Sequence, residues 1–361
     1  MRIHAFLCIC CSLVLGRELR AQNGYSYTID LTHVVQDRVQ VTLFPPLQKS
    51  DKIEFQMPKI VPGTYAISDF GRFITGFEAT DTAGNPLPVD YIDENRWLIR
   101  DAQGMQKITY WVDDTFDSQE SPSILEPGGT NIEEQRIFVL NTFGFCGYLA
   151  GMKDLPITLT VKKPKGFYGS TALLPSRTGE NEDTYEVQNY HRLVDSPIMY
   201  CLPDTAWEHI GGTGVLVSVY SPNRRVSAKS VMHHLSEIMM AQRDYLGGKL
   251  PVERYAFLVG LIPRSGPGEA GALEHSYSSL YLLPEADEES VGGMMRGLAA
   301  HEFFHILTPL RIHSEEIHDF DFMDPRMSRH LWLYEGLTEY AAGHFQVKQG
   351  LISMGQYFRI L

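Results

Sequence analysis

Two histidines four residues apart flank an acidic residue in the run His301-Glu302-Phe303-Phe304-His305. On a helix, positions i and i+4 lie on one face, so both imidazoles can reach a single metal ion. Neutral imidazole suits Zn²⁺, and a catalytic zinc site combines three protein ligands with a water molecule. Glu302 adjoins the first ligand, where its carboxylate can take a proton from the zinc-bound water. The run therefore predicts one bound Zn²⁺, with Glu302 as the general base.

A third ligand is predicted in segment 331–340, whose sequence is Leu-Trp-Leu-Tyr-Glu-Gly-Leu-Thr-Glu-Tyr. We expect a helix here, in which Glu335 completes a His₂Glu site and leaves one position for water. Glu339 follows on the same face, and we expect it to accept the free N–H of a ligand histidine. The alternative is a solvated acidic stripe. Burial of both acids is favoured by their apolar neighbours, which are Leu331, Trp332, Leu337 and Tyr340.

The histidine pair needs a helix, and the preceding residues predict one. Residues 287–290 supply acids and capping side chains of the kind found at helix N-termini. Apolar residues then recur at helical spacing, and Pro309 is expected to end the helix. The alternative is a pair of core histidines that happen to be four residues apart.

Together these segments resemble the glycyl aminopeptidase family of gluzincin (thermolysin-like) zinc metallopeptidases. The resemblance rests on H-E-F-F-H, on Arg311-Ile312, on the 335 − 305 = 30 residues from His305 to Glu335, and on L-W-L-Y-E-G-L-T-E-Y. Leu307 and Leu310 stand where the family has a tryptophan and a lysine. The resemblance implies a zinc aminopeptidase that hydrolyses the first peptide bond of peptides with small N-terminal residues, glycine or alanine.

Substrate contacts are predicted in segment 268–275, which precedes the zinc helix by one strand, expected over 277–283. A glycine-bearing edge strand lets a peptide add alongside it and approach the backbone closely, which points to Gly271 and Ala272 as substrate-binding residues. Glu274 resembles the acid that aminopeptidases of this clan use to hold the substrate's α-ammonium group. Such a carboxylate restricts cleavage to the first bond, because only a free amine offers a compensating charge. The alternative is a turn acid on the surface.

The predicted fold class is α+β, with an N-terminal β-sandwich-like domain over 22–208. Short alternating or β-branched segments there are separated by turn residues, without amphipathic helices. The expected strands are 25–31, 39–44, 52–57, 97–100, 108–112 and 157–161. Segments 57–72 and 193–198 resemble parts of the family's N-terminal domain, although from its residues alone the first is simply a stiff turn fixed by prolines.

The second predicted domain, 209–361, resembles the upper half of a thermolysin-like catalytic domain. We expect a strand at 215–220, an amphipathic helix at 228–246 and a strand at 254–261. Family members continue with a helical lower half and a PDZ domain, so the resemblance implies a catalytic domain truncated at residue 361. The tyrosine that stabilises the oxyanion is then expected beyond that residue. We assign its role to none of Tyr334, Tyr340 and Tyr357.

Two other clusters have simpler interpretations. His233 and His234 point in different directions from the helix at 228–246, so we expect surface residues. Seven acids and histidines crowd the loop 313–324 without regular ligand spacing. That pattern favours a solvated connector over a second cation site.

Composition narrows the class of protein. The chain has 361 residues, of which 43% are hydrophobic and 21% charged, as is ordinary for a soluble protein with two domains. A net charge of −13 argues against nucleic acid and an anionic membrane surface as partners, and it says little else. Peptide substrates are what the family resemblance implies.

The N-terminus resembles a secretory signal peptide over residues 1–21. Arg2 precedes an apolar run, 5–15, that is too short to span a bilayer, and cleavage is expected after Ala21. We therefore predict a periplasmic or extracellular protein without a transmembrane helix in the mature chain. Alternatives are a lipoprotein, given Cys8, Cys10 and Cys11, or a buried N-terminal strand. A disulfide between Cys146 and Cys201 is left open.

Two other functions compete with the aminopeptidase. A zinc endopeptidase or another hydrolase would use the same metal but would not need Glu274. An exported, non-catalytic peptide-binding module would hold a structural or vestigial zinc, and such a site has no use for Glu302 as a base.

Overall fold

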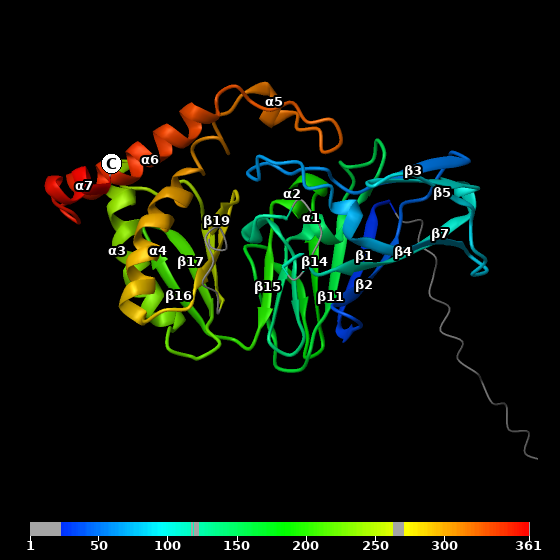
Figure 1. Cartoon of the computed structure of the whole chain (residues 1–361), viewed down its shortest axis with the longest axis horizontal. Coiled ribbons are helices and arrows are strands. Elements are labelled where there is room, and N and C mark those ends of the chain that lie inside the picture. The colour runs from blue at the N-terminus through cyan, green and yellow to red at the C-terminus, as the bar shows by residue number, and fades with distance from the viewer. Residues whose placement is uncertain (1–22, 117, 119–122, 263–270, 361) are drawn as a thin grey trace, which may run out of the picture.

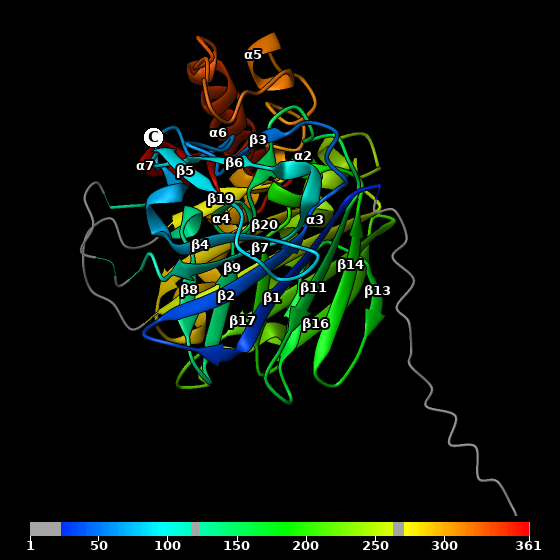
Figure 2. The same ribbon diagram turned by 90° about the vertical axis from the view of Figure 1, so that its right-hand side faces the viewer.

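The computed structural model describes residues 23–116, 118, 123–262 and 271–360. The predicted signal peptide lies outside these residues. Figure 1 shows two β-rich parts side by side, and helices cover the outer face of the C-terminal part. Figure 2 shows that the strands of the largest N-terminal sheet run obliquely across the molecule.

The N-terminal part is built of three sheets, of which the largest has seven strands in the order β13-β14-β11-β1-β2-β7-β4. Along β1 the residues alternate between buried and partly buried from Tyr25 onward, so one face of the sheet lies in the core. Its strands are β1 (Tyr25–Val34), β2 (Arg38–Phe44), β4 (Ile74–Asp81), β7 (Met105–Asp113), β11 (Ile157–Lys162), β13 (Pro175–Thr178) and β14 (Glu182–Val187).

The other two N-terminal sheets have four strands each, in the orders β10-β3-β6-β5 and β12-β15-β9-β8. The first contains β3 (Lys52–Gln56), β5 (Val89–Asp93), β6 (Arg96–Arg100) and β10 (Tyr148–Leu149). The second contains β8 (Asn131–Glu133), β9 (Ile137–Leu140), β12 (Tyr168–Ser170) and β15 (Ile198–Cys201). All six predicted N-terminal strands are present, with ends that differ by three residues at most.

Short helical segments connect these sheets. They are α1 (Thr142–Phe145), α2 (Tyr190–Val194) and three 3₁₀ helices, Phe70–Phe73, Ala102–Gly104 and Glu126–Gly128. The predicted α+β class, with an N-terminal β domain ahead of a catalytic region, is confirmed.

The C-terminal part is a five-stranded sheet in the order β16-β17-β18-β20-β19. The central strands β17, β18 and β20 are parallel, and β19 pairs antiparallel with β20 at the edge. The bounds are β16 (Thr205–Ile210), β17 (Thr213–Tyr220), β18 (Arg254–Ile262), β19 (Gly271–Glu274) and β20 (Ser278–Pro284). The domain boundary predicted after residue 208 falls within β16.

Both faces of this sheet are buried, which explains why its central strands are almost continuously apolar. Helices α3 (Ala228–Tyr245) and α4 (Glu288–Phe304) cover one face and share a core with Val217 and Phe257. On the other face, Leu258 and Leu280 pack against Val139 and Met199 of the N-terminal part. This second cluster joins the two parts through apolar contacts.

The helix that carries the histidines begins where the sequence predicts and ends earlier. Asp287 caps α4 by accepting a hydrogen bond from the backbone N–H of Ser290 at 3.0 Å. The helix ends at Phe304, so His305 is its C-cap and Pro309 lies well beyond it. His305 is therefore on the last turn, next to a chain reversal that leads into α5 (Glu315–His318).

The second predicted helix is α6 (Leu331–Lys348), followed by α7 (Met354–Ile360). Figure 1 shows α6 lying across the ends of α4 and α3. The expectation that buried apolar neighbours enclose Glu335 and Glu339 is wrong, since Trp332 is 72% exposed and the Glu339 side chain is 60% exposed. The reason is that α6 packs on one face only, through residues such as Thr338 and Phe345.

Two further findings bear on the sequence predictions. Cys146 and Cys201 are buried free thiols, so they form no disulfide. Among the described residues, no helix is long and apolar enough to cross a membrane.

Candidate metal centre

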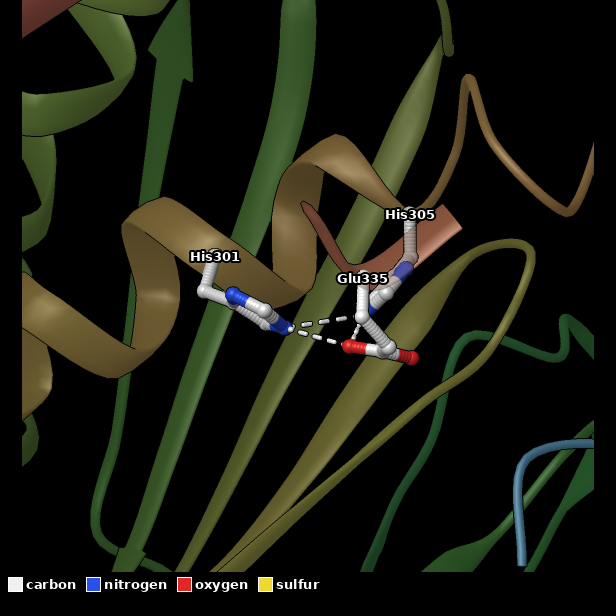
Figure 3. Close-up of side chains that lie close together, drawn as sticks. All are labelled: His301, His305 and Glu335. Carbon is white, nitrogen blue, oxygen red and sulfur yellow. Dashed lines mark hydrogen bonds and ion pairs between the residues drawn. The ribbon is translucent and has the colours of Figure 1, made fainter. Parts of the chain in front are cut away.

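Helices α4 and α6 bring His301, His305 and Glu335 together (Figure 3). The Nε2 atoms of the two histidines are 3.0 Å apart. Glu335 Oε2 lies 3.2 Å from His301 Nε2 and 3.6 Å from His305 Nε2. The potential ligand atoms of all three residues lie within 4.8 Å of one another, as a shared metal ion requires.

The hydrogen-bond partner of Nδ1 in each histidine determines which tautomer the ring adopts. His301 Nδ1 is 2.9 Å from Glu339 Oε2, and His305 Nδ1 is 3.0 Å from the carbonyl oxygen of Thr308. Both partners accept hydrogen bonds, so each Nδ1 carries the proton and each Nε2 presents a lone pair. In this neutral tautomer two lone pairs and a carboxylate oxygen converge, and a cation fits this set.

The pKa values agree with a site that attracts positive charge. Burial opposes protonation of His301, but its hydrogen bond to Glu335 and the charge of Glu302 outweigh burial and raise its pKa to about 9. Burial, joined by the charge of His301, lowers the pKa of His305. Burial acts to raise the pKa of Glu335, but hydrogen bonds from His301 and Tyr65 lower it overall. Without a metal, a proton would occupy part of this cluster.

Glu302 is buried beside the histidines and faces a second acid. Potential ligand atoms of Glu274, Glu302 and His305 also lie within 4.8 Å of one another. Burial raises the pKa of Glu302 to about 7, although the charge of His301 partly offsets it. Burial and then the charge of Glu302 raise the pKa of Glu274 well above its ordinary value. These acids therefore favour a nearby cation.

The predicted substrate-binding residues lie on the edge strand β19. Glu274 is its last residue and pairs with Ser279 of β20, whereas Gly271 pairs with Leu282. The 3₁₀ helix Glu126–Gly128 packs beside β19, and a Cβ atom at Gly271 would lie 3.2 Å from the Pro127 side chain. The neighbouring residues 268–270 lie outside the described part of the chain.

One residue near the cluster was missed by the sequence analysis. Tyr65 comes from the N-terminal part, and its hydroxyl donates to Glu335 Oε1 at 2.8 Å. Although Tyr65 is 48% exposed, partial burial and then the charges of Glu274 and Glu335 raise its pKa, so its hydroxyl stays protonated. Segment 57–72 contains prolines and a glycine that indicate a turn, but nothing in its spacing points to a metal ligand 270 residues away.

A cavity of about 490 Å³ adjoins the cluster and is lined by both parts of the chain. Its walls include Tyr65 and Glu274 together with aromatic residues of the N-terminal part and of the loop before α6. Examples of its lining are Phe143, His191, Phe322 and Tyr334. Such a concave, mostly apolar space beside perturbed acids is typical of a ligand site.

The other clusters singled out in the sequence contribute no residue to this centre, although His313 lines the adjoining cavity. Arg296 contacts His234 Nδ1 at 2.9 Å, and His313 Nε2 is 3.3 Å from His318 Nδ1. Within the described residues, the two groups named above are the only sets of three or more histidines, cysteines or acids close enough to share an ion.

Two segments of the chain match models of known protein families. Residues 26–201 match the Peptidase M61 N-terminal domain, and residues 294–361 match the M61 glycyl aminopeptidase domain. The chain belongs to the M61 glycyl aminopeptidase family. The second match contains all three residues of the metal cluster as well as Glu302 and Glu339.

One of the similar solved structures shares the fold of this M61 chain. An aminopeptidase N family protein from Idiomarina loihiensis is similar with a TM-score of 0.80 and 21% identity. The alignment covers 92% of this chain and 56% of that one, so the M61 chain spans little more than half of its length. An M1 zinc metallopeptidase from Deinococcus radiodurans aligns with a TM-score of 0.49 and 14% identity, covering 91% and 71%. No curated protein matched.

Proposed function

We propose that the protein is a zinc-dependent aminopeptidase that removes small N-terminal residues, glycine or alanine, from peptides. The observation that carries this proposal is the meeting of a His₂Glu cluster with two acids, the buried Glu302 and the half-buried Glu274. Membership of the M61 family supports the reaction class and the preference for small residues.

His301, His305 and Glu335 would hold one Zn²⁺, and Glu339 and the Thr308 carbonyl would keep the two imidazoles oriented. When bound, zinc polarises the carbonyl of the scissile bond and lowers the pKa of a coordinated water. The chain's own residues must then supply the proton transfers and the position of the peptide.

Glu302 would move the proton. Its carboxylate is buried next to His305, and a pKa near neutrality suits a group that both accepts and returns a proton. It takes a proton from the attacking water and gives it to the leaving amine. A structural site would have no need for such an acid in this position.

Glu274 would bind the substrate's α-ammonium group. A half-buried carboxylate that faces Glu302 is unfavourable as an anion, and a cation placed beside it relieves this cost. Because only the first residue of a peptide carries such a cation, Glu274 limits cleavage to the first bond.

Replacing Glu274 with alanine tests this role. We expect kcat/KM on a glycyl or alanyl peptide with a free amine to fall roughly thirtyfold to a few thousandfold, since an ammonium without its partner costs about 2–5 kcal/mol. Zinc content should stay at one equivalent, and the wild type should reject the same peptide once it is N-acetylated. Glu237→Ala, an exposed acid on α3, is the matched control. Equal wild-type rates on free and acetylated peptides would refute the exopeptidase assignment.

The second candidate function is a zinc endopeptidase. It is favoured by the cavity, which is lined by Glu274 but by none of the three proposed ligands, and which offers space for residues that precede the scissile bond. Hydrolysis of acetylated peptides, unaffected by Glu274→Ala, would select this function over the first.

We also propose that the protein is exported. Arg2 followed by the apolar run 5–15 supports a cleaved signal peptide. We expect the secreted mature protein to begin at Gln22, which intact-mass measurement would detect. A mature chain that retains residues 1–21 would contradict this assignment.

A further inference from the structure

Loop 57–69 of the N-terminal part is anchored beside the metal centre. Its base is closed by the Lys59 carbonyl oxygen, which accepts hydrogen bonds from Ser68 N at 2.7 Å and Asp69 N at 2.9 Å. Lys59 N donates to the carbonyl oxygen of Phe322 at 2.9 Å, which ties the loop to the segment between α5 and α6. Ile60 and Val61 are buried in the N-terminal core. The tip of the loop is therefore held in place.

That tip is a tight turn directed at Glu274. The Val61 carbonyl oxygen accepts a hydrogen bond from Thr64 Oγ1 at 2.9 Å, and Pro62 and Gly63 are the central residues. Gly63 has φ +91°, a value that a type II turn requires at this position. A Cβ atom there would lie 3.1 Å from Glu274 Oε1, so the turn backbone packs directly against this acid.

Tyr65 follows the turn in a left-handed conformation. Its φ of 53° is unfavourable for an aromatic residue, and such conformations persist where the surrounding structure imposes them. The result here is that the phenol points away from its own domain. Its hydroxyl reaches Glu335 Oε1, 270 residues later in the chain, at 2.8 Å.

The two oxygens of Glu335 consequently have different partners. Oε2 faces His301 Nε2 at 3.2 Å and His305 Nε2 at 3.6 Å, whereas Oε1 accepts the Tyr65 hydrogen bond. The Glu335 side chain is 37% exposed, because α6 packs on one face only. Neighbouring side chains on α6 therefore do little to orient it. A hydrogen bond to one oxygen disfavours binding of a metal through both.

We propose that Tyr65 is a positioning residue that keeps Glu335 a one-oxygen ligand. This inference rests on the proposed metal site and goes beyond it, because it makes the N-terminal part necessary for the geometry of that site. With Oε1 occupied by the phenol, three protein atoms would hold the metal and a fourth position would stay free for water or substrate. Without the phenol, Oε1 is free to bind as well and to fill that position.

Cobalt substitution of the full chain reports this geometry directly. Co²⁺ replaces zinc in such sites, and its visible absorption is stronger for four-coordinate than for five-coordinate ions. We expect Tyr65→Phe to bind one equivalent of Co²⁺ with weaker, shifted visible bands, because Glu335 would supply both oxygens. For the zinc-bound variant we expect kcat to fall about tenfold to a hundredfold, which is the usual effect of removing a group that hydrogen-bonds to a metal ligand. KM should change little.

A matched control is Tyr340→Phe, which removes the hydroxyl of a half-exposed tyrosine on α6 that stacks on His344. It should leave the Co²⁺ spectrum unchanged. Wild-type and Tyr65→Phe spectra that coincide would overturn the inference while leaving the proposed function intact, and a fall in kcat with no spectral change would instead assign Tyr65 to the substrate. A wild-type protein without a one-equivalent Co²⁺ spectrum would overturn both.

Discussion

Glu302→Gln is expected to lower kcat for peptide hydrolysis on the order of a thousandfold, while the protein retains one equivalent of zinc. The amide has nearly the same shape as the carboxylate but cannot accept a proton, so it removes general-base assistance alone. Glu302 is not one of the three proposed ligands, and the outer partners of His301 and His305 are other groups. Steady-state kinetics together with metal analysis on the same sample would measure both quantities.

Glu237→Gln on the surface of α3 is the control for this change and should behave as the wild type. Near-normal turnover in Glu302→Gln would mean that another group is the base. Glu274 is the obvious replacement, because its carboxylate lies in the same cluster within 4.8 Å. Assaying Glu274→Gln in parallel therefore tests whether Glu274 is the general base in place of Glu302. If neither substitution lowers turnover, the assigned active site is wrong.

His305→Ala is expected to lose its zinc on dialysis, with apparent affinity lowered by more than about a hundredfold, beyond the range for loss of an outer partner. The substitution removes one of three proposed ligands. The two that remain, His301 and Glu335, are too few to hold zinc tightly. Metal content after dialysis, measured per protein chain, is the readout.

His330→Ala removes an exposed histidine just before α6 and serves as the matched control, with metal content equal to the wild type. If His305→Ala still held stoichiometric zinc, the assignment of the metal to this cluster would be wrong. Thermal unfolding of both variants without metal would separate loss of a ligand from loss of the fold.

Much of this protein can be read from local patterns in the sequence. Alternating burial along β1 reflects a sheet with one buried face, and the apolar run of β18 reflects a sheet buried on both faces. Asp287 caps α4 through a hydrogen bond to Ser290, three residues away. The spacing of His301 and His305 places two imidazoles on one helix face. Each of these features depends on residues only a few positions apart.

Predictions that depended on which parts of the chain pack together were less accurate. The apolar residues around Glu335 and Glu339 predicted that both acids are shielded from solvent, but Trp332 is largely exposed and Leu337 is half-exposed. Helical periodicity identifies the helix without stating how many neighbours it has. The predicted end of α4 at Pro309 was also wrong, because the helix ends at Phe304. A proline sets the furthest point that a helix can reach, but the helix can end before it.

Tyr65 shows what only the tertiary structure decided. The sequence alone identified the candidate metal ligands on α4 and α6, but it contains no periodicity or spacing that links residue 65 to residue 335. That contact exists because Leu258 and Leu280 of one sheet pack against Val139 and Met199 of another. Apolar packing of this kind is non-directional, so the residues that create it do not reveal which loops it will bring together.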